Sequence, residues 1–150
     1  MLEERLEQDL KTALLAGDAQ RVSVLRGLKS VLLNEKVAKG KRDSGLTDEE
    51  VLPIFAKEAK KRQESADLYS RGGDEKRQQA ELSEKKIIEE YLPAQLSEDE
   101  VAKLVDEAIR QTGAEGQKDM GKVIGAVRAK AGAAADGALI ARLVKEKLGL

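Results

Sequence analysis

The chain has 150 residues, and its 27 lysines and arginines against 28 aspartates and glutamates give a formal net charge of −1. It contains no histidine, cysteine or tryptophan. These absences remove the usual ligands of zinc, copper and iron–sulfur sites, and they exclude disulfides and catalytic triads built on Ser-His or Cys-His pairs. Its only aromatic residues are Phe55, Tyr69 and Tyr91, so the core has to be aliphatic.

The N-terminal stretch MLEERLEQDLKTALLAG carries an acidic residue every few positions, which is unlike a secretory signal. No stretch approaches the roughly 18 uncharged residues of a membrane span. We therefore expect a cytoplasmic protein that needs no metal or cofactor and has no membrane partner.

Apolar residues at helical spacing predict two helices in the first 40 residues. The first has Leu2, Leu6, Leu10 and Leu14 on one face, with Ala13 beside them, and ends near Gly17. The second can be capped by Asp18 and fades around residues 39–40. Its predicted apolar face consists of Val24, Leu25, Leu28, Val31 and Leu32.

Two further helices are predicted before residue 93. Thr47 and Glu50 form a capping box at the start of the third, with Pro53 placed in about its first turn. Asp74 can cap the fourth, after a break at residues 72–73. The predicted inward residues of the two helices are Val51, Leu52, Phe55, Ala59, Ala66, Tyr69, Leu82, Ile87, Ile88 and Tyr91.

Pro93 disfavours helix in the residue before it, and this places a domain boundary after residues 1–93. In residues 94–150, a second capping box at Ser97 and Glu100 opens a fifth helix. Asp119 and Asp136 can cap a sixth and a seventh. The predicted core residues are Val101, Leu104, Val105, Ala108, Ile109, Met120, Val123, Ile124, Val127, Leu139, Ile140, Leu143, Val144 and Leu148.

No segment alternates as a strand would, so the sequence predicts an all-α protein: an N-terminal four-helix domain followed by a small three-helix module. The two parts differ in their charge distribution. Residues 1–92 mix 18 basic and 19 acidic residues, whereas the stretch from Ala108 to the end has eight basic and four acidic ones. The module therefore carries the local positive charge of this chain.

Residues 118–125, KDMGKVIG, form the least usual stretch, because Gly121 and Gly125 interrupt a predicted helix at a spacing of four. Glycine costs about 1 kcal/mol relative to alanine inside a helix. One explanation is close approach of a neighbouring helix. The other is close approach of a ligand or an RNA phosphate to bare backbone, with Lys118 and Lys122 along one edge.

Catalytic signals are weak. Ser97 and Thr47 are explained as helix caps, and Ser23, Ser30, Ser65 and Ser83 lie in predicted helices without the sharp Gly-flanked turn that exposes a nucleophile. No phosphate-cradling glycine loop is present. Paired carboxylates are abundant and are explained as solvated surface. We therefore expect no intrinsic enzymatic activity.

Six segments resemble the YqeY-like family of small bacterial proteins, in the GatB/YqeY group, and together they span nearly the whole chain. The resemblance lies in DLKTA, RVSVLR, EYLPAQLS, KDMGKVIG, ADG and VKE, which occupy residues 9–13, 21–26, 90–97, 118–125, 135–137 and 144–146. It implies an N-terminal helical domain and a C-terminal module similar to the tail of the B subunit of tRNA-dependent amidotransferase. The label "carbon–nitrogen ligase with glutamine as amido donor" comes through that tail alone.

The resemblance implies that the module binds tRNA, or a protein that handles it, such as the amidotransferase or an aminoacyl-tRNA enzyme. The candidate RNA contacts are Lys118, Lys122, Arg128, Lys130, Arg142 and Lys145. Two alternatives stay open. The protein could be a protein–protein adaptor that uses its polar N-terminal helices, or an accessory subunit of the amidotransferase.

Overall fold

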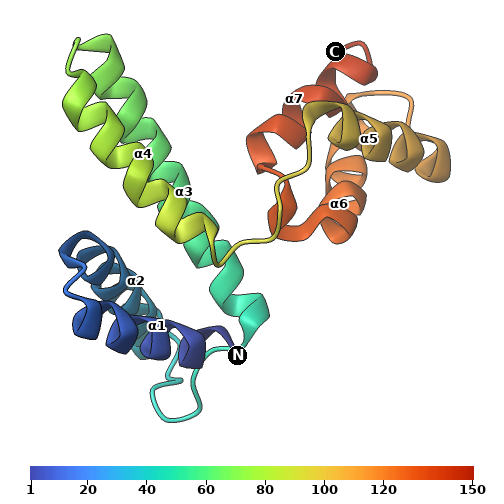
Figure 1. The fold of residues 1–150 in the computed structure, drawn as a ribbon. Coiled ribbons are helices and arrows are strands. Elements are labelled where there is room, and N and C mark those ends of the chain that lie inside the picture. The colour runs from blue at the N-terminus through green and yellow to red at the C-terminus, as the bar shows by residue number, and fades with distance from the viewer. The chain divides into compact units, whose positions relative to one another are not determined.

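In a computed structural model that describes residues 1–150, the chain forms seven α-helices, two short 3-10 turns and no β-strand (Figure 1). The all-α prediction is confirmed. Contacts between residues group the helices into two compact units, Met1–Leu92 (unit 1) and Pro93–Leu150 (unit 2). None of the helices combines the length and the apolar character that a membrane span requires.

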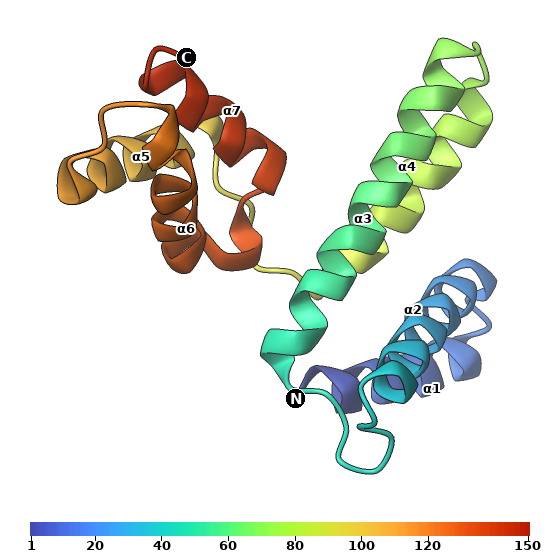
Figure 2. The ribbon, with the colours of Figure 1, turned by 180° about the vertical axis from the view of Figure 1, so that it is seen from behind.

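Unit 1 consists of two helical hairpins. Helices α1 (Leu2–Ala16) and α2 (Ala19–Ala38) form the first, and α3 (Asp48–Arg71) and α4 (Glu75–Glu89) form the second. Both ribbon views show α3 and α4 running side by side along most of their length (Figures 1 and 2). The first hairpin packs against one end of the second.

The predicted caps of unit 1 are present. The Asp18 carboxylate accepts from the backbone N–H of Arg21 at 3.1 Å, and the Asp74 carboxylate accepts from that of Arg77 at 3.0 Å. Thr47 and Glu50 form the predicted capping box. Pro53, however, is the sixth residue of α3 and lies in its second turn. Its missing N–H therefore leaves the carbonyl of residue 49 without its helical donor.

The core of unit 1 lies where the two hairpins meet. Its buried residues are Leu6, Leu10, Ala13, Val22, Leu25, Leu28, Leu32, Leu46, Val51, Phe55, Ala59, Ile88 and Tyr91. Leu14 was expected on the apolar face of α1, but it is 48% exposed because Ala13 takes the buried position. Beyond this core, the outer part of the α3–α4 hairpin buries only Ala66.

Tyr91 fixes the end of unit 1. Its ring is 3% exposed, packs edge-on against Phe55 at 5.6 Å between centroids, and lies under the guanidinium of Arg5. Its hydroxyl donates to the carboxylate of Asp9 in α1. Burial and this hydrogen bond raise the pKa of Tyr91 far above its ordinary value. These contacts hold the C-terminal end of α4 against α1.

Unit 2 contains α5 (Glu98–Thr112), α6 (Met120–Ala131) and α7 (Gly137–Lys147), with 3-10 turns η1 (Gln117–Asp119) and η2 (Gly132–Ala134) before and after α6. Its buried core is aliphatic: Val101, Val105, Ala108, Val123, Val127, Ile140, Leu143 and Val144. Leu96 N–H donates to the carbonyl of Ala134 at 2.8 Å, which ties the segment before α5 to η2.

The capping box of Ser97 and Glu100 is present at the start of α5. The expected cap of the sixth helix is wrong. Asp119 occupies the N-cap position of α6, but its carboxylate makes no cap hydrogen bond and instead accepts from the backbone N–H of Glu115 at 3.1 Å. The reason is that η1 precedes α6 and turns this side chain back onto the loop.

Candidate nucleic-acid interface

The candidate interface is the exposed face of α6 in unit 2. Val123, Val127 and Ala131 turn the opposite face of the helix into the core. Gly121 and Gly125 lie on the exposed face, where a Cβ added to either would meet no atom within 4 Å. Close approach of a neighbouring helix therefore does not explain these glycines. Their backbone is open to solvent.

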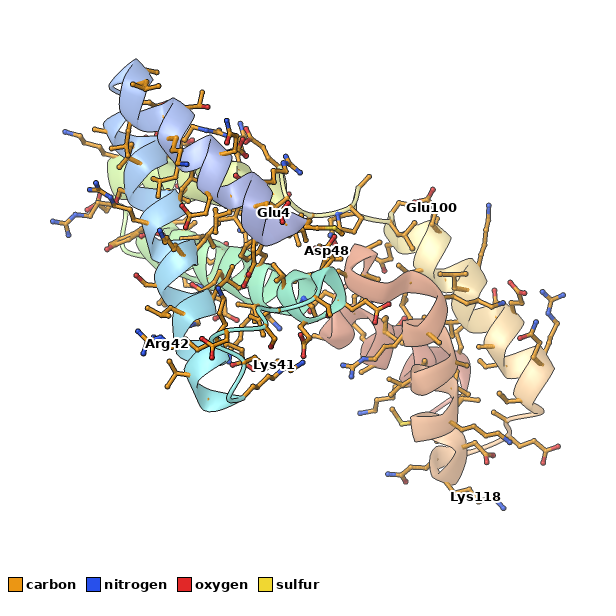
Figure 3. All side chains as sticks on the ribbon, turned by 90° about the horizontal axis from the view of Figure 1, so that it is seen from below. Glu4, Lys41, Arg42, Asp48, Glu100 and Lys118 are labelled. Atoms are coloured by element: carbon orange, nitrogen blue, oxygen red, sulfur yellow. The ribbon has the colours of Figure 1, made fainter.

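Two lysines lie beside the glycines and are free of ion pairs. Lys118 in η1 and Lys122 in α6 are both exposed, and neither forms an ion pair within the chain. Figure 3 shows the Lys118 side chain extending from the N-terminal end of α6, away from the ribbon. The N-terminus of a helix adds positive partial charge at this end. The two lysines thus lie close in sequence to the bare backbone, with Asp119 at the N-cap position between them.

Two of the other predicted contacts are held in ion pairs with α5. Lys130 Nζ lies 2.7 Å from Glu107 Oε1, and this contact lowers the pKa of Glu107. Arg142 lies 2.8 Å from Glu98 and 3.1 Å from Glu146, which raise its pKa. These cations bridge helices of unit 2 and are less available to a ligand than Lys118 and Lys122.

The remaining two predicted contacts, Arg128 and Lys145, differ from each other. A Cβ added to Gly137 would collide with the guanidinium of Arg128, which therefore lies against the start of α7. The sequence suggested close approach of a neighbouring element at Gly121 and Gly125, and the structure has it at Gly137 instead. Lys145, on α7, is exposed and forms no ion pair. The structure thus brings Lys118 and Lys122 together with the glycines and divides the other four among separate contacts.

The acidic residues of α5 change the charge of the whole unit. Residues 93–150 contain nine basic and nine acidic residues, so the excess from Ala108 onward is offset by α5. Lys147 also pairs with Asp106 at 3.0 Å.

Unit 2 has no aromatic residue. No group of three or more aspartate, glutamate, histidine or cysteine side chains is arranged to hold a metal ion.

Residues 3–148 match the family model described as "Yqey-like protein". No curated protein sequence matches the chain. Because the family match covers nearly the whole sequence, the chain belongs to the YqeY-like family.

Proposed function

We propose that this YqeY-like protein binds folded tRNA through the exposed face of α6. The observation that carries the proposal is the pair of exposed lysines free of ion pairs, Lys118 and Lys122, beside the open backbone of Gly121 and Gly125. Lysines one turn apart on a helix can contact neighbouring phosphates of a nucleic-acid strand. Bare backbone beside them lets a sugar–phosphate chain approach closely.

The chemistry of unit 2 favours recognition of the RNA backbone over recognition of bases. Stacking on single-stranded bases uses aromatic side chains, and all three aromatic residues of this protein lie in unit 1. The unit also has no net charge, so attraction comes from a local field and not from the charge of the whole domain. We therefore expect modest affinity that depends strongly on salt.

The test is equilibrium binding of a folded tRNA transcript to the full chain between about 50 mM and about 200 mM salt. Replacing Lys118 and Lys122 together by alanine should weaken binding and reduce the slope of log affinity against log salt by about 2. Lys130→Ala is the matched control, because Lys130 lies on the same helix but pairs with Glu107. Its effect on the slope should be smaller.

Gly125→Leu tests the bare backbone separately. A leucine side chain at this position would stand in open space, so the fold should be retained while RNA approach is blocked. The proposal fails if the wild-type chain does not bind tRNA at low salt, or if the double lysine variant binds as well as the wild type.

A further inference from the structure

A groove in unit 1 lies between α2 and the α3–α4 hairpin. It has a volume of about 330 Å³ and is partly open to solvent. One wall is formed by α2 and the other by the α3–α4 hairpin. Every lining residue belongs to unit 1, and the RNA proposal for unit 2 does not use any of them.

The α2 wall is uncharged. Val24 and Val31 give it a partly exposed apolar surface above the buried Leu28, and Gly27 interrupts that surface with bare backbone. A Cβ at Gly27 would meet no atom within 4 Å, so nothing in this chain fills the space that the glycine leaves. The wall runs over residues 23–31, which is about 12 Å of helix, or a little over two turns.

The opposite wall carries an excess of negative charge. Glu58 and Glu84 line the groove together with Arg62, and Arg62 is held by Glu84 at 3.3 Å and by Glu81 at 3.2 Å. The lining residues of this wall thus carry two carboxylates and one guanidinium. Lys61 also bonds Glu58 from an exposed position.

We propose that this groove binds an α-helix of a partner protein, one whose apolar side chains are flanked by lysine or arginine. The apolar α2 wall would receive the apolar side chains, and the bare backbone of Gly27 would let the partner helix approach closely. The carboxylates on the α3–α4 wall would complement its basic residues. A nucleic acid is disfavoured at this groove because the wall is acidic.

The experiment measures binding of two synthetic amphipathic helical peptides to the full chain. Both have about 14 residues with leucines at helical spacing, flanked by lysines in one and by glutamates in the other. The lysine peptide should bind, and the glutamate peptide should bind at least about tenfold more weakly. Gly27→Leu should weaken binding of the lysine peptide by at least about tenfold, because the leucine fills the groove.

Two further variants separate the groove from other surfaces. Gly125→Leu places the same side chain on a helix of unit 2 and should leave peptide binding unchanged. The double variant Glu58→Gln, Glu84→Gln keeps the shape of the groove and should weaken the lysine peptide several-fold while flattening its salt dependence. Circular dichroism of each variant confirms that the helices are retained.

The proposal is overturned if the lysine peptide does not bind, or if it binds equally well to Gly27→Leu. It is also overturned if sedimentation shows a dimer of the wild-type chain that Gly27→Leu abolishes, because the occupant would then be a second copy. Loss of tRNA binding in Gly27→Leu would equally contradict it, since the groove would then belong to the RNA interface.

Discussion

The two units use their charged residues in different ways. In unit 1, the acidic partners come from different elements, as Arg21 pairs with Glu90 at the end of α4 at 2.7 Å and Lys36 pairs with Glu3 of α1 at 3.0 Å. In unit 2, acidic residues of α5 take up basic residues of α6 and α7 and leave Lys118 and Lys122 free. The comparison shows that counts of charge along the chain do not tell which cations are held in ion pairs. The RNA-binding proposal for unit 2 rests on that distinction.

The same comparison holds for two glycines inside helices. Gly27 in α2 and Gly125 in α6 both have an ordinary helical backbone and open space where a side chain would be. Gly27 faces carboxylates and Gly125 lies near lysines, so the two units present bare helix backbone in opposite electrostatic surroundings. Each unit is thereby proposed to have its own kind of partner.

The largest expected effect tests whether the units are independent. Phe55 is fully buried in the core of unit 1, and Phe55→Ala should lower the free energy of unfolding of that unit by about 3–5 kcal/mol. Amide hydrogen exchange of the full chain measures this for each unit separately. Protection in α3 and α4 should fall, whereas protection in α6 and α7 should stay unchanged.

Val127→Ala is the counterpart of this variant in unit 2, where Val127 is fully buried. It should lower protection in α5, α6 and α7 and leave protection in unit 1 unchanged. The loss of stability should be smaller than that in Phe55→Ala, because fewer buried atoms are removed. If either variant reduces protection in both units equally, the chain unfolds as one cooperative body, and the domain boundary predicted after residue 93 does not separate independently folding units.

A smaller effect is expected at the end of unit 1, from Tyr91→Phe. This change keeps the ring packing but removes the donor to the Asp9 carboxylate, which should cost about 1.5–3 kcal/mol of stability at neutral pH. The folded-state pKa of Tyr91 is raised, so in the unfolded chain the hydroxyl ionises at a lower pH than in the folded one. The contribution of Tyr91 is therefore complete below about pH 10 and is lost as the pH rises further.

Denaturant unfolding of the wild type and Tyr91→Phe between about pH 8 and about pH 11 checks this sign, because other titrating groups are common to both proteins. The difference in stability should narrow as the pH rises. A difference that stays constant across this range would mean that the Tyr91 hydroxyl ionises equally in the folded and unfolded chains.

Features set by neighbours in sequence were predictable, and those set by packing were not. The capping boxes at Thr47 and Ser97 involve a residue three positions away, so the sequence is sufficient to predict them. Asp119 has the same kind of local signal, but η1 redirects its carboxylate to the loop. The open surroundings of Gly121 and Gly125 depend on which face of α6 the core takes.

The candidate site illustrates the same limit. The sequence predicts Lys130 as a contact in the same rank as Lys118 and Lys122, and only the packing of α5 against α6 and α7 shows that Lys130 and Arg142 are paired. The groove of unit 1 was not predicted at all. The one signal that could have pointed to it is Gly27, a glycine in the middle of an otherwise helical pattern.

The two helix glycines give a third, smaller effect of opposite sign. Gly27→Ala and Gly125→Ala should each raise the free energy of unfolding of their own unit by about 0.5–1 kcal/mol, because alanine has less backbone freedom to lose and neither methyl group meets an atom. Hydrogen exchange measured at rising temperature shows which unit has gained stability in each variant. A loss of stability in either variant would show that the space beside that glycine is filled by the protein itself.

The smallest effect compares the two capping-box glutamates. Glu50 accepts from Lys41 and from the backbone N–H of Thr47, with Lys39 nearby, and these contacts lower the pKa of Glu50 to about 2. Glu100 accepts from the backbone N–H of Ser97 at 2.7 Å, which lowers its pKa, but it has no lysine donor. The stabilising effect of each carboxylate is present above its unfolded-state pKa of about 4.3 and disappears as the pH falls through the folded-state value.

Glu50→Gln and Glu100→Gln should therefore destabilise their own units at pH 7 and converge with the wild type in acid. Convergence for Glu50→Gln should be complete only near pH 2, whereas that for Glu100→Gln should come at a higher pH because no lysine donates a hydrogen bond to its carboxylate. Salt at about 1 M should reduce the difference in stability between the wild type and Glu50→Gln more than that between the wild type and Glu100→Gln, since an ion pair is screened more than a hydrogen bond to a backbone N–H. Equal acid profiles for the two variants would show that Lys41 and Lys39 contribute nothing to closing the loop before α3.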